Sequence, residues 1–440
     1  MSRDSLAVAI EALSWMAYEG IGERTALFRA AKQLQIEKPD ELRQAHKLIM
    51  ETARFQNRLD AIIKSARIHE IQRVPHGIVS FLRIVCYLAN VARVHKRELI
   101  RVIQFGREIL GWRELHAYER SIALLVSGSL IPYESGLSEF DSIALRTCHP
   151  VWFVERVVRH FGRDFALEIL RGNQVQLPVY ARLNTLMIEP ATEIGEKVSG
   201  ERVPHLDGVW KLDKPSRIPQ LAKLWPRGFV IQDLASIVTG FVSDAGSGHT
   251  VLDVCAAPGN KTSHLAALMK NRGVIYSIDL SNRRFTRWKA EMKLSGVENV
   301  EPILADARAS PINPGFGADV VLVDPPCSNT GVFARNPSIK WTITAARVNQ
   351  NIARQRALLS EAADHVKPNG TLVYCTCSIL PEENEFIIED FLRRRREFEI
   401  ATQSPFLGSP GLRGLEKCQR FYPHMHDCNG YFIAKLRRVS

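Results

Sequence analysis

Residues 250–262 read TVLDVCAAPGNKT, and this stretch decides the fold of the C-terminal part of the chain. Residues 250–254 are an apolar run that predicts a buried strand, and the turn after them leads into an expected helix over 262–269. The loop lacks the G-x-G-x-x-G pattern of dinucleotide folds, and Asn260 and Cys255 stand where a P-loop needs glycine. A turn of small residues at a helix N-terminus still lets backbone N–H groups meet a carboxylate.

The same alternation of strands and helices continues to the C-terminus. Further strands are expected over residues 273–278, 300–304, 318–323, 371–375 and 431–436. Such alternation predicts a parallel sheet covered on both faces, which binds ligands at the carboxyl ends of its strands. Acids stand in or just after the first four strands, at Asp253, Asp279, Asp306 and Asp324. One such acid is more often a helix cap or a solvated loop residue, but several along one edge indicate a nucleoside site.

S-adenosylmethionine suits this edge because it carries a carboxylate, a ribose and an adenine, and no phosphate. Asp279 is expected to accept hydrogen bonds from both ribose hydroxyls, and Asp306 from the adenine amino group. The small-residue loop would meet the carboxylate. We therefore predict a Rossmann-like, S-adenosylmethionine-dependent methyltransferase domain of the α/β class.

The whole chain has 440 residues, which is too long for one ordinary domain. Hydrophobic residues make up 45% and charged residues 24%, so mostly disordered and collagen-like chains are excluded. Eight cysteines are too few for a disulfide scaffold, and no apolar run approaches the ~18 residues of a membrane span. Residues 1–4 lead into an amphipathic stretch and not a signal peptide. We expect a cytoplasmic monomer with reduced thiols and no membrane partner.

The charge is basic: 58 lysines and arginines stand against 47 acids, for a net charge of +11. A polyanionic partner, with nucleic acid as the first candidate, explains this sign. A basic surface that only aids solubility explains it equally well. Charge is information about association and not about fold.

The N-terminal part reads as helical. Apolar residues recur at helical spacing in 5–19 and again in 41–63. The basic cluster within 95–101 would suit RNA, but a charge run is more often a solvated helix face. Three domains are expected, namely an all-α domain over 1–145, a small α+β adaptor over 146–245 and the catalytic domain over 246–440.

Two motifs after the fourth and fifth strands carry thiols. Asp324-Pro325-Pro326-Cys327 follows one strand, and Cys375-Thr376-Cys377 closes the other. Neighbouring strand ends would place Cys327 and Cys377 beside one pocket. Metal binding is the rival interpretation, but C-x-C without further ligands at metal spacing is weak, so no metal is expected. An inert buried thiol is the ordinary alternative for any single cysteine.

An activated thiol suits methylation of a poor carbon nucleophile. Carbon 5 of cytosine can attack a methyl sulfonium once a thiolate has added to carbon 6, because the ring is then an enamine. Local positive charge should lower the thiol pKa below its usual ~8.5. The attack also needs a proton or hydrogen bond at ring N3, for which Asp324 is the candidate. A second cysteine near the first is a plausible participant in product release.

These motifs resemble a known family. Residues 251–262 (VLDVCAAPGNKT), 324–328 (DPPCS), 376–378 (TCS) and 382–385 (EENE) are similar to those of the RsmB/NSUN RNA (cytosine-5) methyltransferases. The resemblance covers about residues 180 to 440. The helical N-terminal part resembles the RsmB (Fmu) branch, which carries a NusB-like RNA-binding domain.

The resemblance implies roles for individual residues. Cys377 would be the nucleophile and Cys327 the cysteine that assists product release. The cofactor and the target base would be held by Asp279, Asp306 and Asp324 together with the loop Cys255, Ala256, Ala257, Pro258, Gly259, Asn260 and Lys261.

Three positions depart from the family pattern. Asn260 and Asn329 stand where glycine is usual, and Cys375 stands where serine is common. Asn260 would adopt a positive φ less freely than glycine, although better than most residues. Cys375 and Cys377 would share one strand face, so Cys375 is a candidate to substitute partly for the nucleophile.

The resemblance implies an RNA substrate, with small-subunit ribosomal RNA favoured and tRNA as the alternative. Candidates for contacts to the RNA backbone are Arg283, Arg284, Arg287 and Arg335, although each can equally be a surface residue without such a role. The competing hypothesis from another class is a non-catalytic RNA-binding assembly factor that keeps the fold. Retention of both thiols and of the cofactor acids argues against it.

Overall fold

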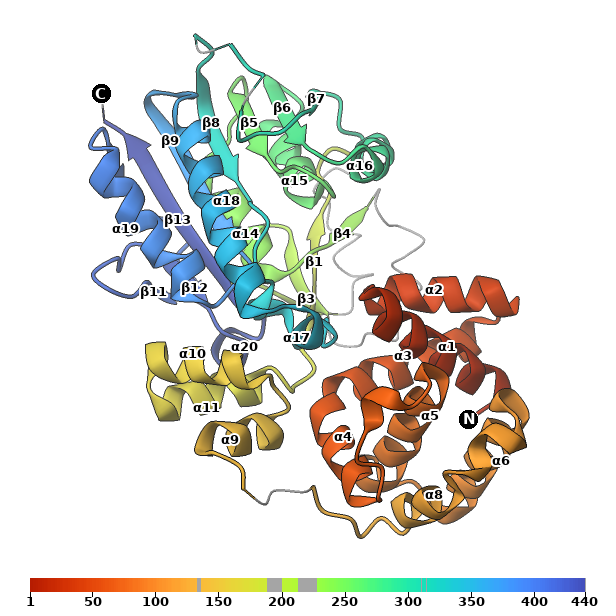
Figure 1. Ribbon diagram of the computed structural model, residues 1–440. Coiled ribbons are helices and arrows are strands. Elements are labelled where there is room, and N and C mark those ends of the chain that lie inside the picture. Colours follow the sequence, from red (N-terminus) through yellow and green to blue (C-terminus); the bar gives the residue numbers. More distant parts are fainter. Residues whose placement is uncertain (133–135, 188–199, 213–227, 310, 314, 440) are drawn as a thin grey trace. The chain divides into compact units, whose positions relative to one another are not determined.

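The computed structural model describes residues 1–132, 136–187, 200–212, 228–309, 311–313 and 315–439. The predicted turn-rich stretch 190–226 therefore lies outside the described residues except for 200–212. By their internal contacts the residues form two units, which are shown in Figure 1. Unit 1 contains residues 1–174 and 336–344, and unit 2 contains residues 175–335 and 345–440.

Unit 1 is helical, as predicted. Its first helix begins after Ser2, whose side chain accepts a hydrogen bond from the Ser5 amide, and it ends at Gly20 in the left-handed conformation. The apolar face of this helix, with Leu6, Ile10 and Leu13, lies in the buried core. The first elements are α1 (Arg3–Glu19), α2 (Glu23–Leu34), α3 (Pro39–Arg54), α4 (Gln56–Ser65), η1 (Ile71–Arg73), α5 (His76–Cys86), η2 (Tyr87–Val91), α6 (Lys96–Leu110), α7 (Trp112–His116) and α8 (Glu119–Val126).

The helices over residues 139–174 also belong to unit 1. They are α9 (Glu139–Thr147), α10 (Val151–Phe161) and α11 (Arg163–Gly172). The division by contacts thus differs from the predicted boundary at residue 145. The reason is packing: Asn57 on α4 donates hydrogen bonds to the carbonyls of Ala144 and His149, so this segment is tied to the helices before it.

A short segment from the C-terminal half of the sequence completes unit 1. Residues 336–344, which include α17 (Ile339–Thr342), pack with the helices of residues 1–174. The Lys340 ammonium group is buried and donates to the carbonyls of Arg54 (2.7 Å) and Cys148 (2.8 Å). The Trp341 indole N–H donates to the carbonyl of Ala53 at 2.6 Å. These contacts explain why residues 336–344 belong to unit 1, although the residues before and after them in the sequence belong to unit 2.

Unit 2 begins with a small antiparallel sheet whose strand order is β2-β3-β1-β4. The strands are β1 (Val179–Leu183), β2 (Gly200–Arg202), β3 (Val209–Leu212) and β4 (Phe229–Ile231). Arg182 in β1 is buried, and its Nε donates to the Gln232 side chain at 2.8 Å. Its Nη2 donates to the hydroxyl of Ser263 on helix α15 (Asn260–Met269). The small sheet is thereby attached to the start of that helix.

The large sheet has the strand order β11-β12-β13-β9-β8-β5-β6-β7, with β10 paired to β13 (Figure 1). Strands β7, β6, β5, β8 and β9 are parallel, whereas β13 is antiparallel to β9. The strands are β5 (Thr250–Val254), β6 (Val274–Asp279), β7 (Val300–Leu304), β8 (Ala318–Val323), β9 (Val366–Thr376), β10 (Phe398–Ile400), β11 (Ser409–Pro410), β12 (Gln419–Phe421) and β13 (Tyr431–Arg438).

Helices cover both faces of the large sheet. In β5, Val251 contributes to the core shared with α14, α15 and α16, while Leu252 contributes to the opposite core shared with α18 and α19. This alternation is the two-residue period of a strand that is buried on both faces. The remaining elements are α14 (Leu234–Val242), α15 (Asn260–Met269), α16 (Asn282–Leu294), η4 (Thr330–Val332), α18 (Ala345–Ala363), η5 (Pro381–Glu383), α19 (Glu385–Arg394) and α20 (Pro423–His426).

The predicted fold class is confirmed: an all-α region and a small antiparallel sheet precede a Rossmann-like sheet. The antiparallel β13 differs from the parallel sheet that we expected. An apolar period indicates that a strand is buried but not its direction, which here follows from the return of the chain to pair with β9. Strand β9 is also longer than expected, since it starts at Val366 and not at Thr371.

Candidate active site

The predicted cofactor loop lies between β5 and α15. Cys255 has a φ of 66° and Gly259 a φ of 113°. The φ of Gly259 lies in a region that side chains rarely adopt, so the backbone favours glycine at this position; an added Cβ would also lie 2.7 Å from the end of the flexible Met292 side chain. Asn260 is already the first residue of α15. We expected that Asn260 would need a positive φ. The residue with the positive φ is Gly259, so the backbone of Asn260 is not strained.

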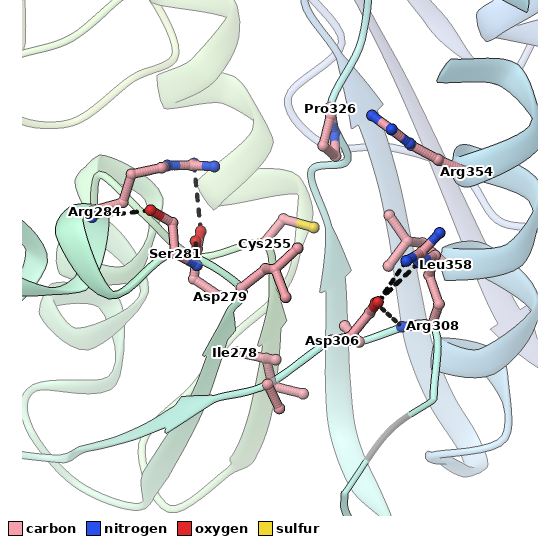
Figure 2. A pocket seen from close by; sticks show the side chains of 13 residues that line it. Cys255, Ile278, Asp279, Ser281, Arg284, Asp306, Arg308, Pro326, Arg354 and Leu358 are labelled. Atoms are coloured by element: carbon pink, nitrogen blue, oxygen red, sulfur yellow. Dashed lines mark hydrogen bonds and ion pairs between the residues drawn. The ribbon is translucent and has the colours of Figure 1, made fainter. Parts of the chain in front are cut away.

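A cavity of about 260 Å³ lies beside this loop, at the carboxyl ends of β5, β6 and β7. Figure 2 shows Asp279 and Arg284 on one side of it, Asp306 and Arg308 on another, and the sulfur of Cys255 between them. The cavity is lined by Cys255, Ile278, Asp279, Leu280, Ser281, Arg284, Ala305, Asp306, Ala307, Arg308, Pro326, Arg354 and Leu358. Of the predicted cofactor residues, the structure brings Cys255, Asp279 and Asp306 to one cavity.

Asp279 ends β6 and is buried at the cavity wall. Its carboxylate accepts hydrogen bonds from the Ala257 amide (3.1 Å) and the Ser281 amide (3.0 Å), and it lies 3.4 Å from the Arg284 guanidinium. A carboxylate has about four acceptor sites, so acceptor capacity remains for hydroxyl groups of a ligand. The same bonds explain how the loop is held against the strand end.

Asp306 follows β7 and pairs with Arg308. The Arg308 guanidinium donates to both carboxylate oxygens of Asp306 and lowers the pKa of this carboxyl group to about 2. The carboxylate is therefore ionised at neutral pH and can accept a hydrogen bond from an amino group. Asp253, in contrast, lies inside the sheet and accepts from the Thr262 hydroxyl at 2.6 Å; burial raises its pKa to about 7.

A second group of charges lies at the ends of β8 and β9. The Lys261 ammonium is 2.6 Å from Asp324 Oδ2, and Cys375 Sγ is 3.7 Å from Asp324 Oδ1. Burial by itself would lower the pKa of Lys261, but the Asp324 carboxylate raises it above its usual range. Lys261 is therefore a permanent positive charge next to the thiols.

The two predicted thiols lie together, with Cys327 Sγ 3.3 Å from Cys377 Sγ. They come from the loop after β8 and from the residue after β9. The hydrogen bond with Cys377, followed by burial, raises the pKa of the Cys327 thiol well above its usual range. Cys327 is therefore a thiol and not a thiolate at neutral pH.

The loop that carries Cys327 is tied to the strand ends by backbone bonds. The Gly331 amide donates to the carbonyl of Cys377 (2.9 Å), and the Gly430 amide donates to the carbonyl of Gly331 (2.8 Å). A Cβ at Gly331 would lie 1.9 Å from the Gly430 oxygen. No other residue type fits without movement of the backbone.

A network of buried hydrogen bonds holds the residues next to Cys327 and Cys377. Glu383 Oε1 accepts from the Ser328 amide at 2.8 Å, and the Tyr374 hydroxyl donates to the Glu383 carbonyl at 2.7 Å. The side-chain amide of Asn384 donates from Nδ2 to the Ser378 carbonyl at 2.8 Å. Glu383 therefore holds Ser328, which follows Cys327, and Asn384 holds Ser378, which follows Cys377. Sequence reasoning did not assign this role to residues 382–385.

The four arginines proposed for RNA contacts differ in their surroundings. Arg284 lines the cofactor cavity and donates to the carbonyl of Ala257. Arg335 donates to the carbonyl of Pro178. Arg283 and Arg287 are exposed on α16. Sequence reasoning missed Arg284 as a wall of the cavity, although its place in the first turn after a strand-end acid is a usable signal.

This arrangement defines the class of the protein, a Rossmann-like methyltransferase with two cysteines at the edge of the cofactor loop. Residues 242–437 match the family described as 16S rRNA methyltransferase RsmB/F. The tRNA (cytosine(72)-C(5))-methyltransferase of Pyrococcus horikoshii is 39% identical over 227 residues, which are 51% of this chain and 57% of that protein. The probable ribosomal RNA small subunit methyltransferase B of Bacillus subtilis is 29% identical over 413 residues, 89% of either protein. The solved structure of PH0851 matches with a TM-score of 0.83 and 30% identity over 99% of both chains.

Two relatives meet both 30% identity and coverage of two thirds of their length: the probable ribosomal RNA small subunit methyltransferase B of Coxiella burnetii (31% identity, 67% of that protein) and the solved structure of PH0851. The chain belongs to the RsmB/F family, a family of S-adenosylmethionine-dependent RNA cytosine-5 methyltransferases. It spans just over half the length of the tRNA-modifying relative and most of the Bacillus relative.

The cavity fits this cofactor. A buried carboxylate with spare acceptor capacity, Asp279, faces a second carboxylate, Asp306, across a space walled by apolar side chains and by Arg284, Arg308 and Arg354. In the part of the chain that the structure describes, no group of three or more side chains is placed to hold a metal ion. Within the same residues, no helix is long and apolar enough to cross a membrane.

Proposed function

We propose that this chain methylates carbon 5 of a cytosine in RNA through a covalent bond between Cys377 and the base. The observation that carries the proposal is the pair of sulfurs, 3.3 Å apart, at the strand edge where the cofactor loop lies. Two thiols at this distance beside a fixed cation supply a nucleophile and a second proton carrier. When bound, S-adenosylmethionine supplies the methyl group.

The residues of the chain divide the work as follows. Cys377 adds to carbon 6 of the cytosine, and the Lys261 ammonium supplies a positive charge near the attacking sulfur. Asp324, which accepts a hydrogen bond from Lys261, stabilises the proton at ring N3. Cys327 assists the release that regenerates Cys377. Asp279 and Asp306 hold the cofactor's ribose and adenine, and the loop Cys255 to Lys261 holds its carboxylate end.

The high pKa of the Cys327 thiol supports its separate role. A thiol that stays protonated does not compete with Cys377 for carbon 6. Once Cys377 is bonded to the base, the hydrogen bond between the sulfurs is lost, and with it the largest cause of the raised Cys327 pKa. With this cause of the raised pKa removed, Cys327 can lose its proton to solvent, and the resulting thiolate can accept the proton from carbon 5.

The experiment is to compare Cys377→Ala and Cys327→Ala with RNA and S-adenosylmethionine. Cys377→Ala should neither methylate nor form a covalent complex. Cys327→Ala should still attack but release poorly, so it should accumulate a protein–RNA complex that survives denaturing electrophoresis. If Cys377→Ala traps RNA and Cys327→Ala does not, the two roles are reversed. If neither variant differs from the parent protein, the thiols are structural and the proposed mechanism fails.

We propose small-subunit ribosomal RNA as the substrate. The match to the Bacillus relative supports this choice, since it extends through the helical N-terminal part, whereas the match to the tRNA-modifying relative covers about half of the chain. A NusB-like RNA-binding role for the helical part is part of the same proposal. Bisulfite sequencing of total RNA from a deletion strain tests it, because the lost 5-methylcytosine would lie in ribosomal RNA or in tRNA. Cytoplasmic location and the monomeric state stay predictions.

The competing function, a non-catalytic assembly factor, makes a different prediction. Such a protein would not need to bind S-adenosylmethionine. Calorimetry with the cofactor and the full chain separates the two functions, because only the enzyme is expected to bind it. The ordered cavity with its two carboxylates favours the enzyme.

A further inference from the structure

Asn329 lies between the two thiols and the backbone of their loop. Its side-chain oxygen is 2.8 Å from Cys377 Sγ and 3.9 Å from Cys327 Sγ. The first distance is short for a hydrogen bond to sulfur, with the Cys377 thiol as donor and the amide oxygen as acceptor. The amide nitrogen of the same side chain is 3.5 Å from the carbonyl of Cys327.

The backbone does not explain why this side chain is present. Asn329 has a φ of 57° and a ψ of 26°, in the left-handed region where glycine carries no penalty. Glycine would make the same turn. The asparagine therefore adds an amide group to the site and nothing that the turn itself needs.

We infer that Asn329 is a positioning residue for Cys377. Its side-chain oxygen accepts a hydrogen bond from the Cys377 S–H, and this S–H therefore does not point at Cys327. The inference rests on the proposed role of Cys377 as the nucleophile. The sulfur therefore has one direction in the resting site, and its S–H is engaged by a neutral acceptor.

The sign of the effect can be separated from a loss of structure. Removing an acceptor of the S–H bond should make the Cys377 thiol easier to ionise, whereas a carboxylate in its place should make ionisation harder, because a like charge opposes the thiolate. The other titratable groups around Cys377 stay constant in such variants. They are Cys327, Lys261, Tyr431, Cys375 and, through Lys261, Asp324.

The test is the rate at which iodoacetamide alkylates Cys377, followed between about pH 5 and pH 10 by mass spectrometry of the peptide. Asn329→Gly should move the midpoint about half to one pH unit lower. Asn329→Asp should move it about one unit or more higher. Both residues tolerate the left-handed conformation, so both variants are expected to fold.

Asn369→Gly is the matched control, because Asn369 also has a positive φ, of 60°, in the same unit, while its side-chain oxygen accepts a hydrogen bond from Arg437. It should leave the Cys377 midpoint unchanged. Unchanged midpoints in both Asn329 variants, or shifts of the same sign, would overturn the inference. Methylation by Cys377→Ala would instead overturn the proposed function, while the alkylation midpoints would still report the bond between Asn329 and the thiol.

Discussion

At the scale of single residues, burial separates Cys375 from the two other cysteines near it. Cys375 lies within β9 and Cys377 follows the end of that strand; both border the same core, yet Cys375 is fully buried whereas Cys327 and Cys377 are only partly buried. Burial, followed by the adjacent Asp324 carboxylate, raises the pKa of the Cys375 thiol. The extra thiol is therefore a poor nucleophile although it is two residues from the proposed one.

We predict that Cys375 does not substitute for Cys377. Cys375→Ser should keep methylation within a few-fold of the parent protein, and Cys377→Ala should show no residual activity that depends on Cys375. The measurement is methyl transfer to RNA for Cys377→Ala and for the double variant with Cys375→Ser. Residual activity that disappears only in the double variant would contradict this prediction.

Asp279 is the residue on which cofactor affinity should depend most. Asp279→Ala removes a buried acceptor that also holds the Ala257 and Ser281 amides, so binding of S-adenosylmethionine should weaken by about 1–3 kcal/mol, or roughly 5- to 150-fold. Calorimetry measures the change, and Asp207→Ala, an exposed aspartate of the same unit, is the control. An unchanged affinity would remove Asp279 from the site.

At the scale of elements, the site depends on three strand ends held in register by backbone bonds. Gly331 in η4 bonds Cys377 after β9 and Gly430 before β13, so the loop with Cys327 is fixed between two antiparallel strands. The distance between the sulfurs is thus set by main-chain geometry and not by the cysteines themselves. Such an arrangement tolerates little displacement of the loop.

Gly331→Ala should therefore separate the thiols while it spares the cofactor cavity. The added Cβ would meet backbone atoms of Gly430 and Cys377, and methylation should fall on the order of 10- to 100-fold. S-adenosylmethionine affinity, measured in parallel, should stay near that of the parent protein. Gly246→Ala is the control, since a Cβ there makes only ordinary contacts. Equal methylation by both variants would show that activity does not need the close backbone packing of Gly331 against Gly430 and Cys377.

At the scale of the whole molecule, the order of residues in the chain does not match the two units. Residues 336–344 follow the Cys327 loop in sequence but belong to unit 1. A truncation that starts at residue 146 removes Arg54 and Ala53, which accept hydrogen bonds from Lys340 and Trp341. Loss of activity in such a truncation would therefore not by itself report on RNA binding.

Lys340 should give unit 1 a characteristic pH dependence. Burial lowers the pKa of its ammonium group to about 7, far below the ~10.4 of an unfolded lysine. Between these two values the unfolded state binds more protons, so the free energy of unfolding should rise with pH in this interval. Lys340→Met should flatten the rise, whereas Lys38→Met, at an exposed site, should preserve it.

The measurement is thermal unfolding of both variants from about pH 7 to pH 10. The hydrogen bonds to two carbonyls favour the charged form, so the rise should be modest. A Lys340→Met profile with the same slope as that of the parent protein would show that Lys340 does not titrate in this range.

The sequence alone determined the α/β fold class, the β5, β7 and β8 boundaries, and the choice of S-adenosylmethionine over a dinucleotide. These features depend on local apolar periods and on residue types at strand ends, both of which can be recognised in the sequence without the structure. Tertiary structure alone decided the direction of β13, the membership of residues 336–344 in unit 1, and the positions of Arg284 and Arg335. The physical reason is that strand direction, burial and ion-pair partners depend on residues far apart in the chain, and a local pattern carries no information about them. For the same reason, the sequence showed that Asn329 departs from the usual glycine, but only the fold places its amide against the Cys377 sulfur.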